Sequence, residues 1–379
     1  MFRQISTLGL IPILLSGLSS CSHHSTVYKE IDLSKKWMEE EHFSLSEMAK
    51  TIRYIPLETD TTCFFSAARC KLMVSENYFY LIPWNKPLMI FSKSGEFRGS
   101  VGSIGQGPGE VEGIASVVVN EKNNWIAIFN QAHASVLLHS YDGRLIREFP
   151  VDRSITRLIP GPDGQLIGLS IDIQDNTIGD ARLIYLEPTG HEVKRIEMYK
   201  TNRLRERLAM SGWLKIQWLG DDQMAVFEYP FDQYYVRNKS GEWALCPFIK
   251  VGNMGEVDGI SFIKDYCLIT AHDPGVQFFI ASMSTGEVTH CSTLIDMAGG
   301  PDLTGMINDM DGGLPFWPEQ GIGDKLAFSI YDASTIIDYA QGNLSYYCGT
   351  PPEMQSSFKE MAAKLSHEDN PVVVVVTLK

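Results

Sequence analysis

A turn built on glycine recurs through the middle of the chain at a nearly constant spacing. Each copy has an apolar run, a polar turn that ends in Ser-Gly, Asp-Gly or Thr-Gly, and a second apolar run. Glycine supplies the positive φ that a tight β-hairpin turn needs. The turns are centred on Gly95, Gly143, Gly190, Gly241 and Gly286, which lie 48, 47, 51 and 45 residues apart. This period predicts one four-stranded propeller blade per repeat and is too long for leucine-rich or ankyrin units.

One period contains four strand-like segments. After Gly113 the chain reads IASVVVN, WIAIFN, SVLLHSY and RLIREFPV, with polar turns between the segments. The same order recurs over 154–198, 211–249 and 260–293. The segments are apolar on both faces, as expected where each sheet lies between two others. A chain of 379 residues exceeds the usual size of a single core, but a propeller grows by repetition around one axis.

The two ends of the chain are predicted to complete the ring. IRYIPLE (52–58) has no hairpin partner nearby, and the chain ends in NPVVVVVTLK (370–379) after a helical pattern over 353–368. Five unpaired valines would be an aggregation hazard, so we expect the two segments to pair in one composite blade. The predicted fold is all-β: a six-bladed β-propeller over 51–379, closed by its N- and C-terminal strands, with a short C-terminal helix insertion. A seventh blade hidden in 294–324 is the alternative.

The glycine-rich stretch GSIGQGPGEVEGI (102–114) has two interpretations, a phosphate-binding loop or a turn. A Walker loop needs Lys-Ser/Thr after its glycine, and a dinucleotide motif needs a following helix. Strand-like segments follow here instead. GEVEGI (109–114) also recurs as GEVDGI (255–260), three periods later. We therefore predict a connection between blades.

The N-terminus has the pattern of an export signal. Arg3 precedes an apolar run of 14 residues, Ile5 to Leu18, which is too short to span a bilayer but typical of a secretory signal. The run ends in Leu-Ser-Ser-Cys, which resembles the lipobox of bacterial lipoproteins. The resemblance implies that residues 1–20 are removed and that Cys21 is lipidated. An ordinary secretory signal with a chance cysteine is the alternative.

The segment 21–50 is predicted to be a tether. Ser22 resembles a signal for sorting to the outer membrane, and His23 and His24 stand where surface-exported lipoproteins of some gut Gram-negative bacteria carry acidic residues. We therefore expect an outer-membrane lipoprotein that faces the periplasm, with the cell surface as the alternative.

Three stretches carry a resemblance to a known family. They are YIPLET (54–59), the GSIGQGPGE connection, and DNPVVVVVTLK at the end of the chain. Together they resemble six-bladed β-propeller lipoproteins of the TolB-like/NHL-like type, which are abundant in gut Gram-negative bacteria. The similarity covers roughly residues 50–379 and the leader. It implies a fold and a compartment and no particular activity.

Charge and cysteine spacing exclude several classes of function. The formal net charge is −14 without any basic run, which argues against a nucleic-acid partner. Six cysteines besides Cys21 show no CxxC spacing, so neither a zinc site nor a thioredoxin-like pair is indicated. Cys63 and Cys70 lie close enough in sequence for a disulfide, which an exported protein permits. Their pairing stays open.

The loops that join the second and third strands of each blade are expected to gather at one mouth of the propeller. Aromatic, amide and carboxylate side chains in these loops suit a sugar or a short peptide, although Asp and Asn also favour turns for backbone reasons. The predicted ligand-binding residues are Trp84, Asn85, Asn130, His133, Asp172, Tyr229, Asp232, His272, Asp273 and Tyr331.

Evidence for catalysis in the sequence is weak. The chain has neither a GxSxG nor an HExxH motif, and the catalytic candidates are His133, His272 and Asp273, as a base with an orienting carboxylate. The acids of 171–180 do not match a calcium loop, so we predict no metal and no cofactor. The predicted function is non-catalytic binding of a glycan or peptide ligand, or of an envelope partner protein, by a propeller held to the membrane through Cys21. The alternatives are a periplasmic hydrolase or lyase acting on glycan or peptide, and a scaffold subunit of an outer-membrane uptake complex.

Overall fold

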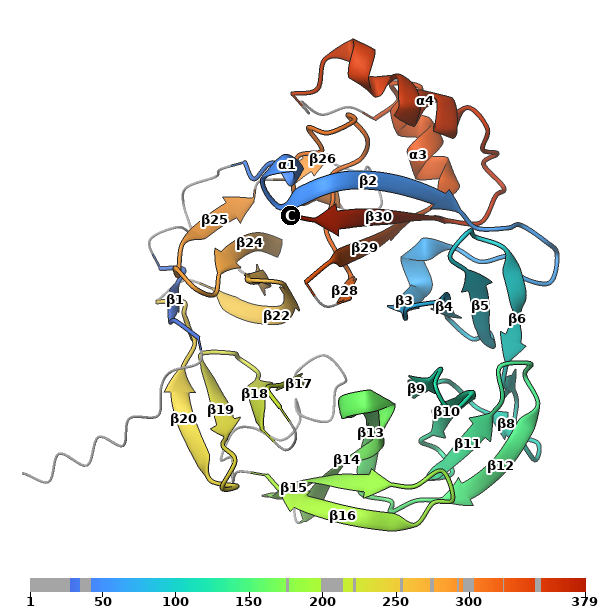
Figure 1. Ribbon diagram of the computed structural model, residues 1–379, viewed down its shortest axis with the longest axis vertical. Helices are drawn as coiled ribbons and strands as arrows, with labels where there is room; N and C mark the ends of the chain where they lie inside the picture. Colours follow the sequence, from blue (N-terminus) through green and yellow to red (C-terminus); the bar gives the residue numbers. More distant parts are fainter. Residues whose placement is uncertain are drawn as a thin grey trace, which may run out of the picture.

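The chain folds into a ring of β-sheets around one axis. The computed structural model describes residues 28–34, 42–174, 177–198, 214–220, 223–252, 255–272, 276–291, 293–295, 303–322, 324–344 and 349–379. Within this part of the chain, six four-stranded sheets follow one another around the ring (Figure 1). The strand nearest the axis is β3, β9, β13, β17, β22 or β28 in the six blades (Figure 1). The predicted six-bladed propeller is confirmed.

Five blades are formed by consecutive antiparallel strands. Blade 1 contains β3 (Cys70–Val74), β4 (Tyr78–Pro83), β5 (Leu88–Ser92) and β6 (Phe97–Val101). Blade 2 contains β9 (Ser116–Asn120), β10 (Trp125–Asn130), β11 (Ser135–His139) and β12 (Leu145–Pro150). Blade 3 contains β13 (Ile155–Pro160), β14 (Leu166–Gln174), β15 (Thr177–Leu186) and β16 (Glu192–Glu197). Blade 4 contains β17 (Leu214–Trp218), β18 (Met224–Glu228), β19 (Gln233–Arg237) and β20 (Trp243–Pro247). Blade 5 contains β22 (Glu256–Ile263), β23 (Tyr266–His272), β24 (Val276–Ser282) and β25 (Val288–Cys291).

Blade 6 combines the two ends of the chain, as predicted. Its strands are β28 (Gln320–Ile322), β29 (Leu326–Tyr331), β30 (Val372–Leu378) and β2 (Ala49–Pro56). β2 and β30 are antiparallel, with Ile52 opposite Val376 and Ile55 opposite Val373. The five valines of β30 are buried between β29 and β2, so the run that looked hazardous in the sequence lies in the interior of a sheet.

Two helices are inserted between β29 and β30, where the sequence predicted one. They are α3 (Ala333–Ala340) and α4 (Ser356–Ala362), and a 3₁₀ turn (Pro352–Gln355) leads into α4. Both pack on blade 6, where Phe358 and Ile336 are buried with Val372. α3 was not predicted because it contains three consecutive β-branched residues, Thr335, Ile336 and Ile337, which favour strands.

The described residues of 294–324 do not form a seventh blade. β26 (Thr293–Ile295) pairs only with β27 (Leu303–Thr304), and the chain then enters β28 of blade 6.

The hydrophobic core is divided among the interfaces between blades. One buried cluster lies at each of the six interfaces, and a seventh lies under the two helices. Between blades 4 and 5, for example, Phe227 and Phe248 pack with Phe279. Because each sheet lies between two others, its inner strands are buried on both faces, as in β10, β11 and β18. The outermost strands β12 and β16 are mostly exposed.

Part of the predicted tether packs against the propeller. β1 (Ile31–Asp32) pairs in parallel with β21 (Ile249–Lys250), and Ile31 and Leu33 are fully buried between blades 4 and 5. α1 (Leu45–Met48) then leads into β2. The leader and Cys21 lie outside the described residues. No helix among those described is both long and apolar enough to cross a membrane.

The glycine-rich stretch joins blade 1 to blade 2, as predicted. β7 (Ser103–Ile104) pairs in parallel with β8 (Glu110–Val111), and the N–H of Gly107 donates to the Glu110 carboxylate at 2.8 Å. A Cβ on Gly105 would lie 2.1 Å from Glu110 Oε2. The loop therefore folds around its own carboxylate. In the second copy of the motif, GEVDGI (255–260), the residues from Glu256 onward belong to β22 itself.

Candidate functional site

A cavity of about 880 Å³ lies between blades 1 and 2. Its walls come from the start of β3, the end of β4, the turn between β4 and β5, the connection at 112–116, and the end of β10. In each antiparallel blade, the loop between the second and third strands lies on the same side as the connection to the next blade. The cavity therefore opens on the side of the ring where the sequence placed the binding site, which we call the mouth.

Three of the predicted site residues line this cavity. Trp84 and Asn85 occupy the turn between β4 and β5, and Asn130 ends β10. The turn is fixed by the backbone N–H of Trp84, which donates to the carbonyl of Arg69 at 2.8 Å, and by Asn85, whose φ is +54°. Asparagine tolerates this left-handed conformation better than most residues. The Trp84 side chain is 77% exposed.

Asn130 has an unusual environment for an amide. The residue is 1% exposed, and its Nδ2 donates to the carbonyl of Glu110 at 3.2 Å. Its Nδ2 also lies 3.4 Å from His133 Nδ1. Its Oδ1 has no hydrogen-bond partner among the described residues. Buried polar atoms are nearly always hydrogen-bonded, so Oδ1 lacks the donor that a buried acceptor usually has.

Other predicted residues are not part of the lining of this cavity. The hydroxyl of Tyr331 donates to the backbone carbonyl of Pro315, and burial raises its pKa to about 12. The ring of Tyr229 packs edge-on against Phe231, with 6.1 Å between the ring centroids. Asp232 is half-buried in the turn after β18. Asp172 belongs to β14, but its side chain lies outside the described part of the chain.

The structure does not bring the two catalytic histidines together. His133 belongs to blade 2 and His272 to blade 5, which are opposite in the ring. His272 is 60% exposed, and its Nδ1 lies 3.5 Å from Asp258 Oδ2. Asp273, the predicted orienting carboxylate, lies outside the described residues. A catalytic role for these residues stays a prediction.

Sequence reasoning missed the basic side chains at the mouth. Arg69, Lys71 and Lys86 line the cavity, with Glu112 as the one acidic residue of the lining. Two more basic residues, Arg157 and Lys215, lie on β13 and β17, the innermost strands of blades 3 and 4. The signal was present in the sequence as one charged residue within an otherwise apolar first strand (CKLMV, ITRLIP, LKIQW). It was missed because the site was expected in loops and not on strands.

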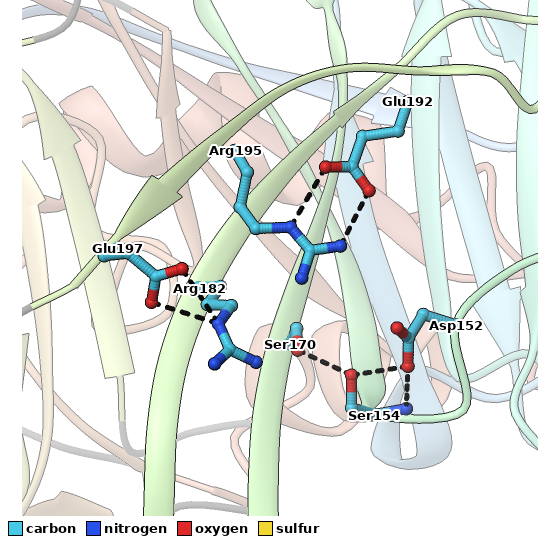
Figure 2. Close-up of polar contacts among 7 residues, drawn as sticks. All are labelled: Asp152, Ser154, Ser170, Arg182, Glu192, Arg195 and Glu197. Carbon is cyan, nitrogen blue, oxygen red and sulfur yellow. Dashed lines mark hydrogen bonds and ion pairs between the residues drawn. The ribbon is translucent and has the colours of Figure 1, made fainter.

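Blade 3 carries a separate polar network (Figure 2). Arg182 and Glu197 pair across β15 and β16 at 3.0 Å, and Arg195 forms a bidentate pair with Glu192. The side-chain hydroxyl of Ser154, nearby, hydrogen-bonds Asp152 at 2.7 Å. Ser154 is also hydrogen-bonded to the buried Ser170 at 2.6 Å (Figure 2). The polar side chains of this network are hydrogen-bonded or ion-paired with one another. Exposed ion pairs of this kind add little to the free energy of unfolding.

Cys63 and Cys70 are free thiols, so the possible disulfide is not formed. The Sγ of Cys63 instead donates to the carbonyl of Glu58 at 3.4 Å. Among the described residues, no group of histidine, cysteine and acidic side chains has the arrangement of a metal site.

The sequence from residue 28 to residue 245 matches the family described as a domain of unknown function, DUF4934. The chain belongs to this family. No curated protein matches the sequence of this DUF4934 chain.

Solved structures share the fold of this DUF4934 chain. A crystal structure of an exported protein from Bacteroides fragilis is similar with a TM-score of 0.63 and 15% identity, over 93% of this chain and 100% of that one. A DUF4221 family member from Bacteroides vulgatus gives a TM-score of 0.45 and 10% identity, over 87% of this chain and 97% of that one. Virginiamycin B lyase from Staphylococcus aureus gives a TM-score of 0.41 and 11% identity, over 67% of this chain and 76% of that one. At 15% identity the first likeness shows the fold alone, and the last two carry no argument.

Proposed function

We propose that the chain is a lipid-anchored propeller of the cell envelope that binds a glycan or peptide ligand at its mouth, in the cavity between blades 1 and 2, without transforming it. The observation that carries the proposal is the exposed indole of Trp84 at the edge of a cavity that is also lined by Asn130, whose buried Oδ1 has no hydrogen-bond partner among the described residues.

The chemistry of this edge suits a ligand that is flat on one side and polar at its rim. An indole presents a large apolar face with few rotatable bonds, so ordering it on binding costs little entropy. Asn85, Asn130 and Gln131 add amide groups to the lining. Such a combination of one aromatic surface and a few placed polar groups is typical of small-ligand sites.

The compartment is part of the proposal. It is supported by the leader of 20 residues that ends before Cys21, and by the shared fold with an exported protein of Bacteroides fragilis. In this proposal Cys21 carries the lipid in the outer membrane, and the propeller faces the periplasm. The TolB-like/NHL-like type of the resemblance stays a prediction.

A ligand screen on the full chain tests the binding function. A bound glycan or peptide raises the melting temperature by mass action, and calorimetry on each hit gives its Kd. Trp84→Ala is expected to weaken binding about thirtyfold, which corresponds to about 2 kcal/mol for a central aromatic contact. Leu245→Ala is the matched control, because Leu245 is 53% exposed on the outer strand of blade 4.

The outcomes separate binding from catalysis. If no glycan or peptide pool shifts the melting temperature, or if Trp84→Ala binds each hit as tightly as the unaltered chain, the proposal is wrong. Consumption of a ligand that stops in His272→Ala would favour the hydrolase or lyase alternative.

A further inference from the structure

Three basic side chains lie at one level of the central channel, near the mouth. Lys71 is the second residue of β3, Arg157 the third of β13, and Lys215 the second of β17. Each of these strands is the innermost of its blade and starts at the mouth. We call these three residues the channel cations.

The channel cations approach one another across the axis. Lys71 belongs to blade 1 and Lys215 to blade 4, which are opposite in a ring of six, and Arg157 of blade 3 lies between them (Figure 1 shows the three strands). The Nη2 of Arg157 donates to the carbonyl of Leu214 at 2.6 Å, which holds the guanidinium beside β17. Burial lowers the pKa of Lys215, and the positive charges of Arg157 and Lys71 lower it further. Burial lowers the pKa of Lys71, and the positive charge of Arg157 lowers it further.

The two lysines of this patch are not paired with carboxylates in the described part of the chain. Among the described residues, neither Lys71 nor Lys215 forms an ion pair. The cavity that Lys71 lines contains Arg69 and Lys86 and one acidic residue, Glu112. Like charges brought together in a partly enclosed space repel one another. In a chain with a net charge of −14, two lysines at the mouth that have no ion pair among the described residues point to an anionic ligand.

We propose that the mouth binds an acidic oligosaccharide, with its anionic groups held by the channel cations and one of its sugar rings on Trp84. This inference rests on the proposed function and names the ligand class for the same site. Anionic groups repeated on successive sugars match basic side chains that are distributed over blades 1, 3 and 4. The anion can be a uronate carboxylate or a sulfate ester, since lysine and arginine bind both.

The test compares acidic and neutral oligosaccharides on the full chain. Titration calorimetry is performed with trigalacturonate, a chondroitin sulfate tetrasaccharide, and neutral oligosaccharides of matched length. At least one acidic probe is expected to bind about tenfold or more tightly than its neutral counterpart. Its affinity is expected to fall as salt is added, because the contact is electrostatic.

Two lysine variants locate the contact. Lys71→Met and Lys215→Met are each expected to weaken binding of the acidic probe about tenfold and to leave neutral probes unchanged. Lys71→Arg, which keeps the charge, is expected to restore most of the affinity. Lys239→Met, in the exposed outer turn of blade 4, removes the same charge away from the mouth and is expected to have no effect.

The results distinguish this inference from the proposed function. Equal binding of acidic and neutral sugars, lost only in Trp84→Ala, would overturn the anionic ligand and leave the binding function standing. Lysine variants that bind the acidic probe as tightly as the unaltered chain would also overturn it, as would a preference for an oligoglutamate peptide over every acidic sugar. If no sugar or peptide shows Trp84-dependent binding, both fail.

Discussion

The turn glycines have a role at the residue scale beyond supplying a positive φ. Gly95 has φ +92°, and a Cβ placed on it would lie 2.2 Å from the carbonyl oxygen of Pro56 in blade 6. Gly143 approaches Ser100 of blade 1 in the same way, and Gly190 approaches Phe149 of blade 2. In these three blades the hairpin turn therefore packs against the outermost strand of the preceding blade.

Gly95→Ala is expected to destabilise the protein by more than the cost of its backbone conformation. A positive φ costs an L-residue about 1–2 kcal/mol, and the contact with Pro56 has to open as well. Gly342→Ala is the matched control, because Gly342 has φ +84° and a Cβ added to it would have nothing within 4 Å among the described residues. Urea unfolding should show a larger loss for Gly95→Ala by about 1 kcal/mol or more. Equal losses would mean that the approach to Pro56 is not tight.

At the element scale, the closing strand decides whether the ring forms. β30 is paired on both sides, with β29 and β2. Just before it, Asn370 is fully buried, and its Nδ2 donates to the carbonyls of Glu58 at 2.6 Å and Cys63 at 3.0 Å. These bonds join the segment after β2 to the segment before β30, so the two ends of the chain are held at two places.

Val374→Asp is expected to prevent the ring from closing. Val374 is 2% exposed in the middle of β30, and an unpaired carboxylate there costs several kcal/mol, on the order of the 5–15 kcal/mol that stabilises a typical protein. Thr377→Asp is the control on the same strand, at a half-buried position. The measurement is the soluble folded fraction and the midpoint of urea unfolding. Similar values for the two variants would contradict a closing role for β30.

At the scale of the whole molecule, the closed ring creates an environment that no single blade has. Glu319 directly precedes β28, the innermost strand of blade 6. Although water reaches its side chain, the surrounding protein raises its pKa from 4.5 to about 7. Burial, and then the charge of Glu319, raise the pKa of the Cys70 thiol in blade 1 to about 12.

The raised pKa of Glu319 predicts a pH dependence of stability. Below pH 4.5 the carboxyl is protonated in both states, and between pH 4.5 and about 7 the folded state holds more protons than the unfolded state. The free energy of unfolding should therefore decrease as the pH rises through this window. Glu319→Gln is expected to remove up to about 1 kcal/mol of that decrease, a small effect because water screens the group.

Urea unfolding at several pH values checks this prediction. The comparison includes Glu353→Gln, which changes an exposed glutamate near α4. Curves for Glu319→Gln and the unaltered chain that run parallel from pH 4.5 to about pH 8 would refute it.

Features that depend on a few neighbouring residues could be predicted from the sequence. The glycine period, the apolar strands and the isolated end segments of Ile52 and Val374 predicted six blades and a composite closure, because turn chemistry and apolar patterning act over a few residues. The turn of Trp84 was also located in this way. Two features were not predicted: α3, whose run of β-branched residues favours a strand, and the docking of Ile31, whose partners lie more than 200 residues away in the sequence.

The repeat and the pairing of the chain ends could be predicted from the sequence alone, since each follows from contacts between neighbouring strands, whereas the choice of six blades over seven needed the structure. Only the tertiary structure decided which polar residues meet. It packed the half-buried Tyr229 and Tyr331 against hydrophobic clusters, placed His133 and His272 in opposite blades, and placed Lys71 and Lys215 across one channel. The physical reason is that the neighbours of a side chain across the ring depend on its height along the channel axis and on the direction in which it points. No local sequence pattern encodes either.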